Sequence, residues 1–194
     1  MILDFSRDKL TLVVEITENG HALLKHFGYG ECRDARLKKA KWCPLAEVHL
    51  CGENPNDHHF AKHTGSYGSY ALKYVSHAET ATNKGRRVDL LLSDGRINVT
   101  VSYEICTAAN VLRAWTTVEN VSDAPVGLEY VSSFSYTGLD DGDAASAAQD
   151  IRIGLPHNSW YREANWRFYT LPELGFDRIN SFSGKRIALS NTGS

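Results

Sequence analysis

The chain has 194 residues, and its 21 Lys and Arg against 23 Asp and Glu give a formal net charge of −2. A charge this close to zero offers no broad electrostatic footprint for nucleic acid or for an anionic membrane. The hydrophobic share of 42% argues against disorder, and the length suffices for one large core. We therefore expect residues 1–194 to form one domain, or part of one, that binds no nucleic acid.

Apolar runs, the first residues and the cysteines indicate in which cellular compartment the protein is expected. No apolar run approaches the ~20 residues that a transmembrane helix needs, so we expect no membrane partner. The first residues lack a basic segment followed by an apolar stretch, which is the mark of a signal peptide. The four cysteines, Cys32, Cys43, Cys51 and Cys106, form no CxxC pair. Reduced thiols in a cytoplasmic protein are the simplest interpretation.

Alternation with a period of two dominates the chain from its beginning. It predicts a strand over 10–17, a turn at Glu18-Asn19-Gly20 and a return strand over 22–29. Residues 33–41 read as a solvated loop or short turn, and 52–69 and 138–149 as long polar connections. Further strands are expected over 72–76, 87–92, 96–105, 112–118 and 126–136.

Turn residues separate these strands at short intervals. Ser93-Asp94-Gly95 between two strand-like runs is a strong hairpin signal, and a polar turn with a proline spans 120–125. No helix of ten or more residues is expected. Many short strands bounded by turns predict an all-β fold, an antiparallel β-sandwich. Residues 185–189 begin a strand-like run that stops in a turn at 190–194, so we expect a piece of something longer.

Several side-chain groups could carry chemistry, but none has a decisive pattern. His49, His58, His59, His63 and His77 cluster in the sequence without metal-ligand spacing. Asp140-Asp141-Gly142-Asp143 suggests a calcium loop, yet the twelfth position would be Ile151 or Arg152. Glu53 and Asp57 share a loop, but nothing places them around a scissile bond. With no nucleophile elbow or phosphate loop either, we assign no catalytic residue, metal or cofactor.

The most unusual stretch is residues 158–169, where Trp160, Trp166 and Phe168 share one parity and Tyr161 and Tyr169 the other. Flat aromatic rings beside planar polar groups suit sugar rings, which stack through their C–H faces. The alternative is a strand packed on both sides, part core and part domain interface.

The order of these blocks resembles the N-terminal domain of bacterial α-galactosidases of glycoside hydrolase family 36. The likeness covers nearly the whole chain. It is carried by Glu18-Asn19-Gly20 with 22–29, by Leu-Lys-Tyr-Val-Ser-His at 72–77, by 88–103, by 111–126 with Val118-Glu119-Asn120, and by 158–175 and 185–193. No single motif among them is a catalytic signature.

The resemblance implies a β-supersandwich of the galactose-mutarotase-like kind, cut short at its C-terminal end. The retaining (β/α)8 barrel with its two catalytic aspartates would follow and is absent from these residues. The parent would hydrolyse terminal α-galactosyl residues of oligosaccharides as a homo-oligomer, and this domain would serve assembly and shape the sugar pocket. An edge left without its final strands could pair with another copy.

In oligomeric members a loop of this domain reaches a neighbouring subunit's sugar pocket, and residues 52–59 match it, although Asn54 departs from the usual acid. The implied pocket or interface residues are Glu53, Asn54, Asp57, His58, His59, Trp160, Tyr161 and Trp166. Two other functions stay open. A free-standing carbohydrate-binding module would use the aromatic segment, and an aldose mutarotase would use histidines with an acid as general acid and base.

Overall fold

The computed structural model describes residues 1–31, 43–53, 65–136 and 148–175. The chain divides into two compact units, Met1–Gly138 and Leu139–Ser194, and each is described by itself. The predictions for 33–41, Asp140–Asp143 and 185–194 lie outside the described residues.

The first sheet of unit one has three antiparallel strands in the order β1-β2-β3. They are β1 (Ile2–Asp4), β2 (Leu10–Ile16) and β3 (Ala22–Tyr29). The hairpin predicted over 10–29 is confirmed, with pairing from Leu10 opposite Tyr29 to Ile16 opposite Ala22. Gly20 adopts a φ of 77° at the turn, a conformation that glycine tolerates without steric cost.

The second sheet has four antiparallel strands in the order β5-β6-β7-β8. They are β5 (Lys73–Thr82), β6 (Gly85–Ser93), β7 (Ile97–Cys106) and β8 (Val111–Asn120). The predicted Asp-Gly hairpin is confirmed. The Asp94 carboxylate accepts hydrogen bonds from the backbone N–H groups of Arg96 and Ile97 at 2.8 and 2.9 Å, which fixes the turn between β6 and β7.

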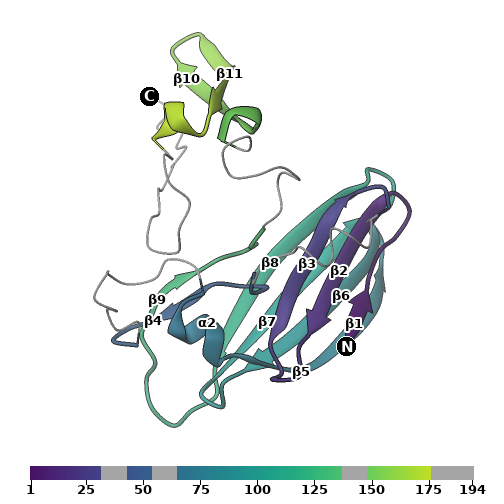
Figure 1. The fold of residues 1–194 in the computed structure, drawn as a ribbon, viewed down its shortest axis with the longest axis vertical. Coiled ribbons are helices and arrows are strands. Elements are labelled where there is room, and N and C mark those ends of the chain that lie inside the picture. Colours follow the sequence, from purple (N-terminus) through teal and green to yellow (C-terminus); the bar gives the residue numbers. More distant parts are fainter. Residues whose placement is uncertain (32–42, 54–64, 137–147, 176–194) are drawn as a thin grey trace. The chain divides into compact units, whose positions relative to one another are not determined.

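One hydrophobic core joins the two sheets, which Figure 1 shows as facing layers. Alternate residues of β2, β6 and β7 point inward and are almost fully buried, as the period-two pattern predicts. The core includes Leu12, Val14 and Leu24 from the first sheet and Val88, Leu90, Val99, Val101 and Tyr103 from the second. The expectation of an all-β, sandwich-like antiparallel fold is confirmed.

A smaller layer closes the core. It consists of β4 (Val48–Leu50), which pairs with β9 (Leu128–Val131), and of the short helix α2 (Tyr67–Ala71). Helix α2 begins inside the connection predicted to be polar loop, because the Ser66 hydroxyl caps its first turn by accepting from the Ser69 N–H. Two strand bounds were wrong. β9 is much shorter than 126–136, and β5 is much longer than 72–76.

The two errors have the same cause, which is that pairing partners decide strand length. β9 ends where the Ser132 carbonyl accepts a hydrogen bond from the Thr116 hydroxyl at 2.8 Å. Phe134 and Tyr136 then pack edge-on against Phe27 instead of continuing the strand. β5 extends because β6 pairs with it along its whole length, although its second half has no hydrophobic alternation.

Unit two contains a hairpin of β10 (Arg152–Ser159) and β11 (Arg162–Thr170), followed by the 3-10 turn η1 (Pro172–Leu174). The interpretation of 158–169 as one strand packed on both sides is therefore wrong. The chain reverses at Trp160 and Tyr161, and Tyr161 and Ala164 adopt positive φ values of 58° and 51°. The Asn158 side chain accepts from the Ala164 N–H at 2.7 Å and stabilises the reversal.

In unit one, the hydroxyl of Tyr103 on β7 is a polar atom inside the apolar core between the two main sheets. The side chain is fully buried, and no described residue forms a hydrogen bond with the hydroxyl. Burial raises the pKa of the phenol well above its ordinary value, so the group stays neutral.

Replacing Tyr103 with phenylalanine should therefore raise the free energy of unfolding by about 1 kcal/mol, because the desolvation cost of an unpaired hydroxyl disappears. Urea unfolding followed by circular dichroism measures the change. Tyr74→Phe is the control, since the Tyr74 hydroxyl is bonded to His77 Nδ1 at 2.7 Å and its removal should bring no gain. A loss of stability in Tyr103→Phe equal to that in Tyr74→Phe would contradict the prediction.

Candidate functional site

The β10–β11 hairpin gathers the aromatic residues of unit two. Trp166 lies opposite Pro156 and Phe168 opposite Gly154, and directly paired residues project from the same face of a hairpin. A Cβ atom built on Gly154 would lie 2.9 Å from Phe168 Cε1 and 3.5 Å from Trp166 Cε3. The two rings thus extend over Gly154, where only a glycine leaves them room. We call Gly154, Pro156, Trp166 and Phe168 the aromatic face.

The tip of the hairpin adds two more rings. Trp160 and Tyr161 stand edge to face, with ring centroids 5.3 Å apart and an interplanar angle of 83°. Trp160, Tyr161, Trp166 and Phe168 are 72%, 84%, 57% and 69% exposed, respectively. Large aromatic groups with this exposure are uncommon on a soluble surface and mark a site of interaction.

The opposite face of the hairpin is different. Ile153 pairs with Tyr169, and Leu155 pairs with Arg167. Ile153, Leu155 and Tyr169 are only partly exposed, whereas Arg167 is exposed. The Tyr169 hydroxyl is 2.8 Å from His157 Nε2. Tyr169 and His157 are therefore engaged with each other within the hairpin, and the aromatic face is the side that presents exposed flat rings.

Glu53, the first predicted pocket residue, belongs to unit one and is held by an ion pair. Arg96 donates from Nη2 to Glu53 Oε2 at 2.9 Å and from Nη1 to Oε1, and from Nε to Asp94 Oδ2 at 3.1 Å. Hydrogen bonding to Arg96 lowers the pKa of Glu53 below its ordinary value, so the carboxylate is charged at neutral pH. Glu53 thereby anchors its segment to the β6–β7 turn.

The other predicted residues divide into two groups. Trp160, Tyr161 and Trp166 come together on the hairpin. Asn54, Asp57, His58 and His59 lie outside the described residues, so the proposed loop over 52–59 stays a prediction.

The described histidines do not converge on one centre. His21 Nε2 is 2.9 Å from Lys73 Nζ, and His49 pairs its ring with Tyr130 at a centroid distance of 5.1 Å. Burial, together with the nearby Lys73 charge, lowers the pKa of His21, which favours the neutral ring. Within the part of the chain that the structure describes, no group of three or more His, Cys, Asp or Glu is placed to hold a metal ion.

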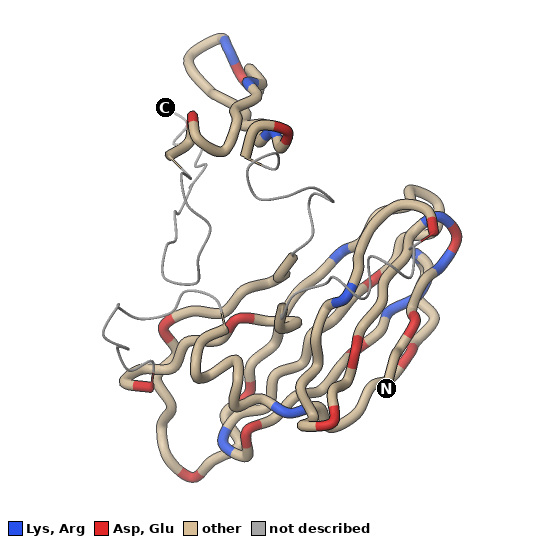
Figure 2. Tube along the Cα trace, in the orientation of Figure 1, with Lys and Arg blue, Asp and Glu red and all other residues tan. Residues whose placement is uncertain are grey.

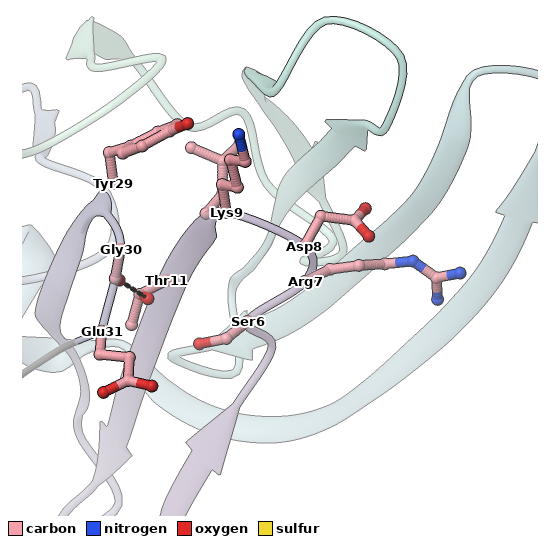
Figure 3. A pocket seen from close by; sticks show the side chains of 9 residues that line it. Ser6, Arg7, Asp8, Lys9, Thr11, Tyr29, Gly30 and Glu31 are labelled. Atoms are coloured by element: carbon pink, nitrogen blue, oxygen red, sulfur yellow. Dashed lines mark hydrogen bonds between the residues drawn. The ribbon is translucent and has the colours of Figure 1, made fainter.

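A shallow hollow lies where β2 begins and β3 ends (Figure 3). Its volume is about 310 Å³, and residues 6–11 and 29–31 line it. Lys9 Nζ sits 5.9 Å from the centroid of the Tyr29 ring, and the Thr11 hydroxyl donates to the Gly30 carbonyl. Arg7 and Asp8 are exposed and extend away from Tyr29 (Figure 3), so the residues that line the hollow do not bring a set of polar groups to one ligand position.

Over the described ranges of the chain, surface charge (Figure 2) and hydropathy indicate no other site. Figure 2 shows basic and acidic residues interspersed along the strands of unit one, without a region of a single sign. Among the described residues, no helix combines the length and the apolar character needed to cross a membrane.

Comparison of the chain with protein-family models, curated proteins and solved structures gives no match. The resemblance to family 36 α-galactosidases accordingly remains a prediction that rests on the sequence blocks.

Sequence reasoning missed three members of the aromatic face as site residues, namely Gly154, Pro156 and Phe168. Phe168 carries a usable signal, since it shares the parity of Trp166 within the same strand. Gly154 carries none, because its place beneath the rings depends on the register of β10 against β11.

Proposed function

We propose that the chain is a non-catalytic, sugar-contacting β-sandwich region of an α-galactosidase-like glycoside hydrolase. The observation that carries the proposal is the aromatic face, where Trp166 and Phe168 offer adjacent, exposed rings over Gly154. Aromatic rings of this kind bind the apolar C–H face of a pyranose while the sugar hydroxyls remain hydrated. The sequence resemblance is the support for the enzyme class, and the all-β fold agrees with it.

In this proposal the catalytic carboxylates belong to a barrel in the same parent protein, and the substrate is a terminal α-galactosyl residue. The region shapes the sugar pocket and takes part in assembly of a homo-oligomer. The arrangement of Glu53 supports a structural role in place of a catalytic one, because Arg96 already binds both of its oxygens.

The same aromatic face favours one further function, a free-standing carbohydrate-binding module. Such a module needs a flat, exposed aromatic platform on a stable β-scaffold and no catalytic residues. The two functions differ in the parent gene, where several hundred codons with alternating strand and helix patterns downstream of Ser194 would support the hydrolase.

Titrating the full chain with melibiose or raffinose tests the sugar contact, and NMR chemical shifts of the tryptophan indoles follow it. We expect millimolar binding, which corresponds to about −4 kcal/mol. Trp166→Ala and Phe168→Ala should each weaken it about tenfold, because each removes one stacking ring. Tyr29→Ala removes an equally exposed ring of unit one and serves as the control. Unchanged affinity in both hairpin variants would refute the sugar contact.

Two activity measurements test the proposal that the chain is not itself catalytic. The chain alone should release no aryl group from an aryl α-galactoside, and turnover in the ordinary range of about 1–1,000 per second would overturn the proposal. Polarimetry of fresh α-galactose should show the buffer rate, whereas acceleration would identify an aldose mutarotase.

A further inference from the structure

The first strand of the four-stranded sheet has one open side. β5 pairs only with β6 among the described strands, and it stands at the edge of the order β5-β6-β7-β8. Its ten residues form the joint longest strand of the structure, and the seven from Val75 to Ala81 are all exposed. A long, exposed edge presents unpaired N–H and C=O groups to any other strand.

The other edges of the two large sheets are shorter, partly covered or less exposed. β1 has only three residues. β3 is covered by a bridge from Leu23 to Pro44 and by the Tyr136 hydroxyl, which donates to the Phe27 carbonyl at 2.8 Å. β8 is as long as β5, but exposed and partly buried residues alternate along most of it, and the Thr116 hydroxyl donates to the Ser132 carbonyl beside it. Within the described residues, β5 is therefore the most exposed of the long edges.

The sequence of β5 does little to protect this edge. Natural edge strands are blocked by proline, by lysine or by bulges. Residues 75–82 contain no proline and no lysine. The register shift between Tyr74 and Ser76 is the one irregularity, and it lies at the start of the strand, where the Tyr74 N–H is already bonded to the Gly20 carbonyl at 2.8 Å.

We propose that β5 pairs with β5 of a second copy of this chain, antiparallel and centred on Ala78. The two four-stranded sheets then form one continuous sheet across a two-fold axis. In this register Ala78 faces Ala78 of the second copy, a small residue at the point where the strands cross. Isologous pairing of this kind satisfies the edge of both copies and closes the assembly at a dimer.

The side chains of β5 favour this register. His77 lies opposite Leu90 and Glu79 opposite Val88, so both project from the same face of the sheet. His77 Nδ1 is 2.7 Å from the Tyr74 hydroxyl, and Glu79 forms an ion pair with Arg86 of β6. Pairing about Ala78 places His77, through Nε2, directly across from Glu79 of the second copy, and it does so twice because of the symmetry. On the other face it places Ser76 across from Thr80. Imidazole–carboxylate and hydroxyl pairs both stabilise neighbouring strands.

Sedimentation velocity of the full chain over a range of concentrations tests the proposal, which is independent of the sugar contact. We expect a monomer–dimer equilibrium for the native chain. Ala78→Lys should shift the chain to monomer, because a lysine at the crossing point faces its symmetry copy. Thr117→Lys is the matched control, since Thr117 is exposed on β8, and it should leave the dimer intact.

Two substitutions of His77 test the same pairing in case Ala78→Lys impairs folding. His77→Lys should tighten the dimer by about tenfold and His77→Glu should weaken it by a similar factor, because the first places a cation and the second an anion opposite Glu79 at both symmetry-related positions. A purely structural effect would move both variants in the same direction. A chain that stays monomeric at every concentration, or a dimer that Ala78→Lys and His77→Glu leave unchanged, would overturn the proposal.

Discussion

Replacing Glu47 with alanine should lower the free energy of unfolding by about 3 kcal/mol, because the buried carboxylate is the common acceptor of several donors. Glu47 is 6% exposed. Its Oε1 accepts from the Gly65 N–H at 2.6 Å, and its Oε2 accepts from the Ser69 hydroxyl at 2.7 Å. Removal of the carboxylate takes this acceptor from the partly buried Gly65 N–H and from the buried Ser69 hydroxyl.

The same residue also ties α2 to two strands. The Ser69 hydroxyl accepts from the Val48 N–H at 2.8 Å while it donates to Glu47, so β4 and α2 are coupled through one side chain. The Glu47 N–H donates to the Ser132 hydroxyl at 2.8 Å, which links the network to the segment after β9. Loss of the carboxylate should therefore loosen α2 and β4 together, whereas the backbone bond from Glu47 to Ser132 remains.

Urea unfolding measures the cost, with Glu119→Ala as the control for losing an exposed glutamate. Glu47→Gln keeps the size and one acceptor oxygen, so its loss of stability should fall between those of the two alanine variants. If Glu47→Ala were as stable as Glu119→Ala, the network would contribute nothing and the prediction would be wrong.

The two main sheets could be predicted from the sequence because the residues that specify each strand and turn are close together in the sequence. Over β2, β6 and β7 the alternation of apolar and polar residues marks the buried face, over β8 it marks the less exposed face, and Gly20 and Gly95 mark the turns. Inward residues such as Val88, Leu90 and Val99 are then buried as expected.

The network around Glu47 could not be predicted in this way. It joins Glu47 to Ser132 across 85 positions, and a serine gives no sequence signal of a distant partner. The hairpin of unit two was missed for another reason. Its reversal uses Trp160 and Tyr161, residues that are not typical of turns, and depends on a positive φ at Tyr161. The aromatic face thus follows from a register that only the structure supplies.

Replacing Gly85 with alanine should lower the free energy of unfolding by about 3 kcal/mol, since the new methyl group has no space and the backbone conformation disfavours it. Gly85 begins β6 with a φ of 153°. A Cβ atom there would lie 2.2 Å from the Ile105 carbonyl oxygen and 2.8 Å from Thr107 Oγ1. Relief requires β6 and β7 to separate, which breaks the pairing of Gly85 with Cys106.

Gly95→Ala separates the steric contribution from the contribution of backbone conformation. Gly95 lies in the next turn of the same sheet with a φ of 88°, but no atom beyond its chain neighbours lies within 4 Å of the added Cβ position. It should therefore lose only the conformational part, about 1 kcal/mol. Urea unfolding of both variants gives the comparison. Equal losses would mean that the contact with Ile105 relaxes at no cost, and that φ alone requires glycine at these turns.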